Sequence, residues 1–127
     1  MKETEQRDRF LVDEMRHHLG VVALEVRGGK ARLESSAEPL YALEHATELL
    51  AEAAEKTSSR FKTANDDVPW KLLRLFRHDV AHPYDIGAAR LDLDQLWRFA
   101  RDDAPRIAKR LRSAKFPKDS RIEELPT

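Results

Sequence analysis

Apolar residues recur at steps of three and four along four stretches of the chain, the spacing that places them on one side of an α-helix. These stretches are residues 3–27, 39–56, 67–82 and 92–111. Gly28 and Gly29 suit the end of the first stretch, Ser36 suits a cap before the second, and Pro83 ends the third. The pattern therefore predicts an all-α fold, an up-down helical bundle of four to five helices.

The intervening segments carry weaker signals. Residues 57–67 lack any period, which predicts a loop, and Pro105 removes a backbone donor inside the fourth stretch. We therefore expect a kink or break in that helix near Asp102 and Asp103. Residues 114–127 contain little apolar matter, so we predict one domain over residues 1–113 followed by a tail.

The first predicted helix is apolar on two sides. Its main stripe suits an internal core, and a weaker stripe lies roughly opposite. That second stripe holds Phe10, His17, Val21 and Leu24. A helix that is apolar on two sides is buried on two sides, and in a small protein the second contact is often another subunit. We interpret His17 and the adjacent His18 as residues at a helix contact rather than as catalytic groups.

Composition narrows the class of protein. A chain of 127 residues suits one domain, and the absence of cysteine excludes disulfides, thiol catalysis and cysteine-based zinc sites. No apolar run approaches the roughly 18 residues of a membrane span, and the charged N-terminus does not suit a signal peptide. We therefore expect a soluble, cytoplasmic protein.

Charge is balanced overall but unevenly distributed. The 23 Lys and Arg offset 23 Asp and Glu. Residues 34–55 hold six Glu and no Lys or Arg, whereas residues 70–118 hold twelve Lys and Arg against six Asp. The C-terminal half can therefore present a positive surface to phosphates, although ordinary solvated helix faces explain the same counts and are the better interpretation from charge alone.

Residues that can carry chemistry gather between Pro69 and Tyr84. They are Arg74, Arg77, His78, Asp79, His82 and Tyr84. Histidine can move protons to and from ribose and phosphate oxygens, and arginine can bind and stabilise a phosphate, so the set suits metal-independent phosphodiester cleavage. Two alternatives stay open. Either the cluster simply decorates an exposed helix face, or His78 and His82 bind zinc with a third ligand such as Asp85 or His45.

Geometry limits how Arg77 and His82 can cooperate. On one continuous helix, residues five apart point about 140 degrees away from each other. They can converge only if His82 lies at a frayed helix end or if a second copy of the chain completes the site.

The segment from Arg77 to Tyr84 reads R-x4-H-x-Y, with His78 at a polar position after the arginine. With the lead-in Val68-Pro69-Trp70 and helical segments on both sides, it resembles the signature of HepT-like proteins of the HEPN ribonuclease superfamily. The resemblance covers residues 8–113.

The resemblance implies an all-α, two-fold homodimer with both motif copies in a cleft at the interface. It implies a metal-independent endoribonuclease toxin that needs no cofactor and acts on RNA, for example tRNA or mRNA. Its partner would be a minimal nucleotidyltransferase antitoxin that transfers AMP onto Tyr84. In this hypothesis His82 is the general acid/base, Arg77 stabilises the phosphate, and His78, Tyr84 and Arg74 support them. The alternative is a non-catalytic HEPN subunit that partners a nucleotidyltransferase.

Overall fold

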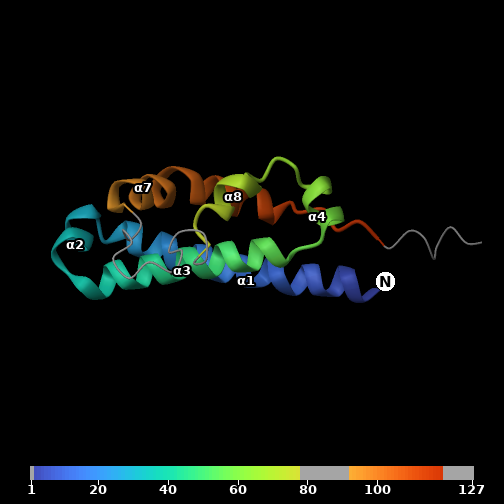
Figure 1. Ribbon diagram of the computed structural model, residues 1–127, viewed down its shortest axis with the longest axis horizontal. Coiled ribbons are helices and arrows are strands. Elements are labelled where there is room, and N and C mark those ends of the chain that lie inside the picture. The colour runs from blue at the N-terminus through green and yellow to red at the C-terminus, as the bar shows by residue number, and fades with distance from the viewer. Residues whose placement is uncertain (1, 78–91, 119–127) are drawn as a thin grey trace, which may run out of the picture.

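The computed structural model describes residues 2–77 and 92–118, and within these residues it contains helices and no strand (Figure 1). In chain order the helices are α1 (Lys2–Arg27), α2 (Lys30–Ser35), α3 (Ala37–Lys56), α4 (Ser59–Ala64), α5 (Trp70–Arg74), α7 (Leu93–Arg98), the π-helix η1 (Phe99–Asp103) and α8 (Ala104–Arg112). The prediction of an all-α fold is confirmed for the part of the chain described.

The two longest helices, α1 and α3, run antiparallel along the length of the molecule, and the segment of α7, η1 and α8 runs lengthwise beside them (Figure 1). Their facing stripes form one core. Its fully buried members include Val12, Met15, Val22, Leu43, Leu50, Leu96, Ile107 and Leu111. Removing each such side chain from water stabilises the fold by roughly 1.5–3 kcal/mol, so the predicted stripes of α1 and α3 do hold the bundle together.

Helix α1 ends where the sequence predicts, at the Gly28–Gly29 pair. Gly29 adopts a φ of 88°, a conformation that a side chain would strain. The chain then forms the short helix α2, which the periodicity did not reveal because it buries only Leu33. Helix α3 follows after Ser36, which adopts an extended conformation without making a side-chain cap.

The segment predicted as a loop, residues 57–67, contains helix α4, so that prediction is wrong. Ser58 caps the helix by accepting a hydrogen bond from the amide of Phe61, at 3.1 Å. The buried carboxylate of Asp8 on α1 accepts from the amide and the hydroxyl of Ser58, at 2.9 and 2.6 Å. A helix of six residues has too few positions for a period to show, and its stability depends on this distant aspartate.

Helix α5 is also shorter than predicted, because its regular part ends at Arg74 rather than near His82. The amides of Leu75, Phe76 and Arg77 each donate to the carbonyl three residues earlier, which tightens the chain into successive turns. Pro83 is therefore not what ends this helix.

The helix is irregular before Pro105, where a kink or break is predicted, but it changes into a π-helix rather than ending. Helix α7 starts at Asp92, whose side chain accepts from the amide of Asp94 at 3.0 Å. The segment then passes through η1, where the amide of Ala104 donates to the carbonyl of Phe99, five residues back. Since Pro105 has no amide hydrogen, this change of register lets the helical segment continue into α8.

Residues just after α8 pack onto the bundle. The ring centres of Phe116 and Phe61 lie 5.2 Å apart, and the guanidinium of Arg9 lies 4.2 Å from the centre of the Phe116 ring. The domain boundary at residue 113 stays a prediction. Among the helices described, none combines the length and apolar character that a membrane span requires.

Candidate functional site

Arg77 lies three residues beyond the end of α5, facing the last turns of α3. Its Nη1 donates to Oε1 of Glu55 at 3.1 Å, and its Nε lies 3.8 Å from Oε1 of Glu52. The side chain of Arg77 is 20% exposed, so most of it is shielded from solvent. Two carboxylates on one rigid helix therefore fix the direction of this guanidinium.

The backbone that carries Arg77 is anchored by aromatic packing. Phe76 is buried, and its ring centre lies 4.6 Å from that of Phe99 in η1. Leu73, one turn earlier, is also buried in the core. The π-helix thus supplies the surface against which the turn before Arg77 packs, so the predicted break in the fourth helix supports the position of the candidate catalytic arginine.

Sequence reasoning missed the role of two residues at this site, Glu52 and Glu55. The charge counts alone favoured solvated helix faces, but both glutamates are only partly exposed and face Arg77. The sequence did contain a signal for this pairing, because residues 34–55 hold six Glu and no Lys or Arg. Any ion pairs of these glutamates must therefore come from cations elsewhere in the fold. Pairing between segments far apart in sequence leaves no local spacing to recognise.

Arg74 shares one of these carboxylates. Its Nε lies 3.6 Å from Oε1 of Glu55, but its side chain is 64% exposed, over three times the value for Arg77. An exposed pair of this kind contributes little to stability, so Arg74 keeps freedom to reorient. The two arginines therefore differ in kind: Arg77 is positioned by the fold, and Arg74 is not.

The other predicted site residues, His78, His82 and Tyr84, lie outside the described residues, as does Asp85. Within the described segments no group of three or more His, Asp or Glu side chains is arranged to bind a metal ion. The roles of these three residues, and the convergence of His82 with Arg77, stay predictions. Helix α5 ends before Arg77, and the separation of about 140 degrees expected on one continuous helix stays untested because residues 78–82 lie outside the described residues.

The geometry around Arg77 defines what this group can do chemically. A guanidinium carries five N–H donors in one planar fork, and the contacts with Glu52 and Glu55 orient the fork of Arg77 relative to α3. The same carboxylates repel a phosphate that approaches from their side.

Comparison with known proteins agrees with the resemblance of the motif. The family model described as Ribonuclease HepT-like matches residues 3–114. No curated protein and no solved structure matches the chain. The match spans α1 to the end of α8 and includes the segment of Arg77, so the chain belongs to the HepT-like ribonuclease family.

Proposed function

We propose that this protein is the toxin of a type II toxin–antitoxin system, a metal-independent endoribonuclease that cuts RNA through its R-x4-H-x-Y motif. The observation that carries the proposal is the guanidinium of Arg77, oriented by Glu52 and Glu55 at the end of α5. Membership in the HepT-like ribonuclease family supports the reaction class.

In the proposed mechanism, an imidazole accepts the proton of a ribose 2′-hydroxyl as that oxygen attacks phosphorus. The bond from phosphorus to the 5′-oxygen breaks, and the leaving oxygen receives a proton. His82 carries these proton transfers, because an imidazole exchanges protons near neutral pH. Arg77 stabilises the charge on the pentacoordinate phosphate, His78 orients the groups, and Tyr84 hydrogen-bonds the phosphate.

We propose that the active form is a two-fold homodimer. Phe10 and Leu24 on α1 support this part, because they are 62% and 57% exposed and lie on one side of the helix. These residues belong to the weaker apolar stripe that predicted a subunit contact. Sedimentation of the purified protein tests it: a dimer is expected, and Phe10→Glu with Leu24→Glu is expected to give monomers.

The proposed partner is a minimal nucleotidyltransferase antitoxin that transfers AMP from ATP onto the hydroxyl of Tyr84. The added phosphate would place negative charge and bulk beside the arginine and histidine, which repels RNA. Intact-mass measurement after co-expression tests this step. Addition of one AMP, and its loss in Tyr84→Phe, is expected, and an unchanged mass contradicts the modification.

The decisive experiment compares Arg77→Ala and His82→Ala with the parent protein. Each is expected to lower RNA cleavage by at least about 100-fold, since each removes a group that acts on the transition state. Each is also expected to abolish growth inhibition while leaving the far-ultraviolet circular dichroism unchanged. Arg27→Ala, at the exposed end of α1, is a matched control for loss of a cation.

Two outcomes would redirect the proposal. If both variants stay as toxic as the parent, the catalytic assignment is wrong. If the purified parent binds a nucleotidyltransferase and ATP but never cleaves RNA, the protein is a non-catalytic HEPN subunit.

A further inference from the structure

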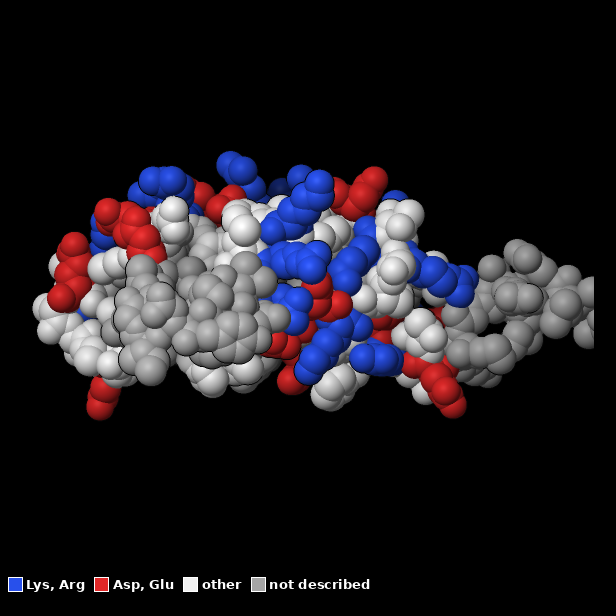
Figure 2. Space-filling view, viewed as in Figure 1, with Lys and Arg blue, Asp and Glu red and all other residues white. Residues whose placement is uncertain are grey.

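The end of the described chain is strongly basic. From Ala104 to Lys118 the sequence contains six cations and no acid, although the whole chain is neutral. The cations are Arg106, Lys109, Arg110, Arg112, Lys115 and Lys118. Figure 2 shows Lys and Arg side chains gathered across the middle of one face, between α7 and α4, with fewer acidic side chains among them. Such a surface attracts polyanions.

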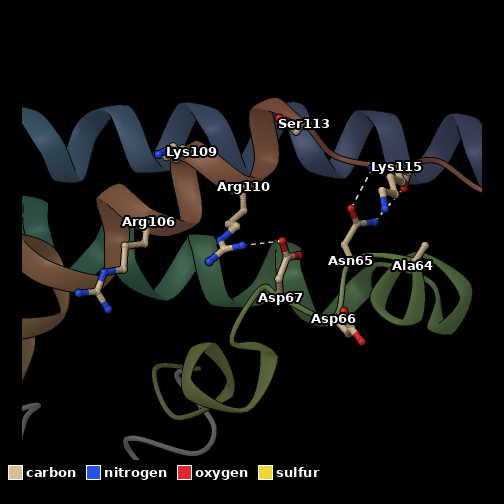
Figure 3. Close-up of a pocket in the computed structure, with 9 residues that line it drawn as sticks. All are labelled: Ala64, Asn65, Asp66, Asp67, Arg106, Lys109, Arg110, Ser113 and Lys115. Carbon is tan, nitrogen blue, oxygen red and sulfur yellow. Dashed lines mark hydrogen bonds and ion pairs between the residues drawn. The ribbon is translucent and has the colours of Figure 1, made fainter.

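Part of this basic segment borders a groove of about 620 Å³. One wall is α8 and the segment after it, and the other wall is the end of α4 with the turn of residues 65–67 that follows it (Figure 3). Four cations line it: Arg106, Lys109, Arg110 and Lys115. The lining residues are charged or polar apart from Ala64.

The two walls are locked together by Asn65, which is buried. Its Nδ2 donates to the carbonyl of Lys115 at 2.8 Å, and its Oδ1 accepts from the amide of Lys115 at 2.8 Å. The same Nδ2 donates to the carbonyl of Phe61 at 2.9 Å, and the indole of Trp70 donates to the carbonyl of Asn65 at 3.1 Å. The groove is therefore a built feature of the fold rather than a chance arrangement of side chains.

Charge inside the groove is only partly neutralised. Arg110 donates to the carboxylate of Asp67 at 2.9 Å, as Figure 3 shows. Neither Arg106 nor Lys109 makes an ion pair with any other described residue. Asp66 points away from α8 in Figure 3. Two long cationic side chains on successive turns of α8 thus remain available to an anion.

We propose that this groove binds the phosphate backbone of the RNA strand that flanks the cleavage point, a proposal that rests on the proposed ribonuclease function. Asp67 and Arg77 are ten residues apart. Their α-carbons therefore lie at most roughly 35 Å apart, and helix α5 between them shortens that span. At roughly 3.4 Å per nucleotide, about ten nucleotides of a stacked strand cover this upper limit.

A nucleic acid fits the groove better than an acidic protein does. Protein interfaces depend on aromatic and apolar anchors in desolvated pockets, and this lining offers only a single alanine. Phosphate contacts need cations and polar groups, which the groove supplies, and they carry no sequence information. The groove therefore contributes affinity and register, and the choice of cleavage site lies elsewhere.

The test measures binding of a fluorescein-labelled single-stranded RNA of about 20 nucleotides, twice the estimated span. The full-length protein carries His82→Ala so that the RNA stays intact, and fluorescence anisotropy follows binding over a range of KCl concentrations. In this His82→Ala protein, the further substitutions Arg106→Gln and Lys109→Gln are expected to weaken RNA binding about 10-fold near 0.1 M salt. The slope of log Kd against log salt is expected to fall by about 1.4, or about 0.7 for each phosphate that the variant no longer neutralises.

Two matched pairs of substitutions accompany this variant. Arg7→Gln with Arg27→Gln removes two exposed cations from α1 and is expected to change neither the affinity nor the slope. Arg106→Lys with Lys109→Arg keeps both charges and is expected to restore most of the binding. Arg106 and Lys109 are both exposed, so circular dichroism and urea unfolding are expected to match the parent.

Specific outcomes overturn the groove assignment. The assignment fails if the Arg106→Gln/Lys109→Gln variant and the α1 control have the same RNA affinity and the same dependence of log Kd on log salt. It also fails if the His82→Ala protein without these substitutions binds no RNA at any salt concentration. Unchanged RNA binding with loss of binding to a nucleotidyltransferase would assign the groove to a protein partner instead. The proposed function fails separately if His82→Ala leaves RNA cleavage unchanged, and binding is then measured on an RNA with 2′-O-methyl groups, which lacks the attacking 2′-hydroxyl and stays intact.

Discussion

Arginine plays different roles in two regions of this molecule. At the end of α5, Arg77 is mostly buried and its guanidinium contacts two glutamates of α3. On α8, Arg106 is exposed and makes no ion pair with the described residues. The first arrangement fixes direction, and the second leaves charge free to be neutralised by a ligand.

The difference indicates how a chain with no net charge can act on RNA. Glutamates of α3 offset the charge of Arg77 but define its geometry, which suits a group that must meet one oxyanion. The surplus of cations lies on α8, where attraction to many phosphates matters more than direction. In the proposed function, local arrangement rather than total charge therefore separates catalysis from RNA binding.

The largest expected difference in RNA cleavage between the end of α5 and α8 comes from replacing an arginine in each region by lysine. Lysine cannot contact two glutamates and a phosphate with one planar group, so Arg77→Lys is expected to lower kcat for RNA cleavage by about 100-fold. Arg106→Lys keeps the charge that backbone binding needs and is expected to change kcat/KM by less than about 2-fold. Single-turnover cleavage assays measure both. Equal losses in the two variants would mean that the two arginines have the same role.

The sequence predicts the bundle well where helices are long. Helices α1 and α3 have enough turns for their apolar period to show, and Gly29 and Asp92 mark a helix end and a helix start by local chemistry. Helix α4 was missed because six residues show no period and because its cap depends on Asp8, fifty residues earlier. The length of α5 was misjudged because packing of Phe76 on η1 replaces regular helix with turns.

The candidate site divides in the same way. The motif identified Arg77 from sequence, and the family match covers that residue. The contacts with Glu52 and Glu55 were not predictable, because they join segments more than twenty residues apart. The groove beside α8 was visible in the sequence only as a basic stretch. Its walls meet through the hydrogen bonds of Asn65, which no local pattern announces.

Glu55 provides a sharper test of the idea that Arg77 is positioned. Glu55→Ala removes the carboxylate at 3.1 Å from Nη1 and is expected to lower kcat about 10-fold with little change in KM, because the guanidinium loses its direction but keeps its charge. Glu55→Gln retains an oxygen acceptor and is expected to recover activity to within about 3-fold of the parent. Initial rates over a range of RNA concentrations separate kcat from KM.

The matched control for this pair is Glu38→Ala, which removes an exposed carboxylate from the first turn of the same helix. It is expected to behave as the parent does. A gain of activity in Glu55→Ala would show instead that the carboxylate restrains Arg77 by competing with the phosphate.

Removal of a carboxylate that pairs with an arginine is expected to have a smaller effect in the groove than at Arg77. Asp67→Asn removes the carboxylate that pairs with Arg110 and is expected to tighten RNA binding about 3-fold and to raise the salt slope by about 0.7. Both partners are about half exposed, so stability is expected to change little. Asp13→Asn removes the partner of Arg16 on α1 and is the control. Unchanged affinity in Asp67→Asn would mean that Arg110 does not contact RNA.

The smallest expected effect concerns His18, which is far in sequence from both Arg77 and the groove beside α8. The stability of the protein at low pH, to which His18 contributes, limits the pH range in which these two regions can be compared. Burial lowers the pKa of His18 below its ordinary value of 6.5, with Glu14 opposing the shift and His17 and His45 adding to it. The unfolded chain then binds the proton more readily than the folded one. Stability is therefore full above about pH 6.5 and falls as pH drops through the lowered pKa.

His18→Gln is expected to reduce the loss of folding stability between about pH 7.5 and about pH 5.5. The urea concentration at the midpoint of unfolding, measured at both pH values, reports this loss. His17→Gln, which removes one neighbouring charge, is expected to flatten it less. Equal slopes in the parent and His18→Gln would contradict the assignment. Cleavage that depends on the imidazole of His82 is also expected to depend on pH. Its pH profile is best measured in the His18→Gln protein, where a loss of rate at low pH reports the site rather than unfolding.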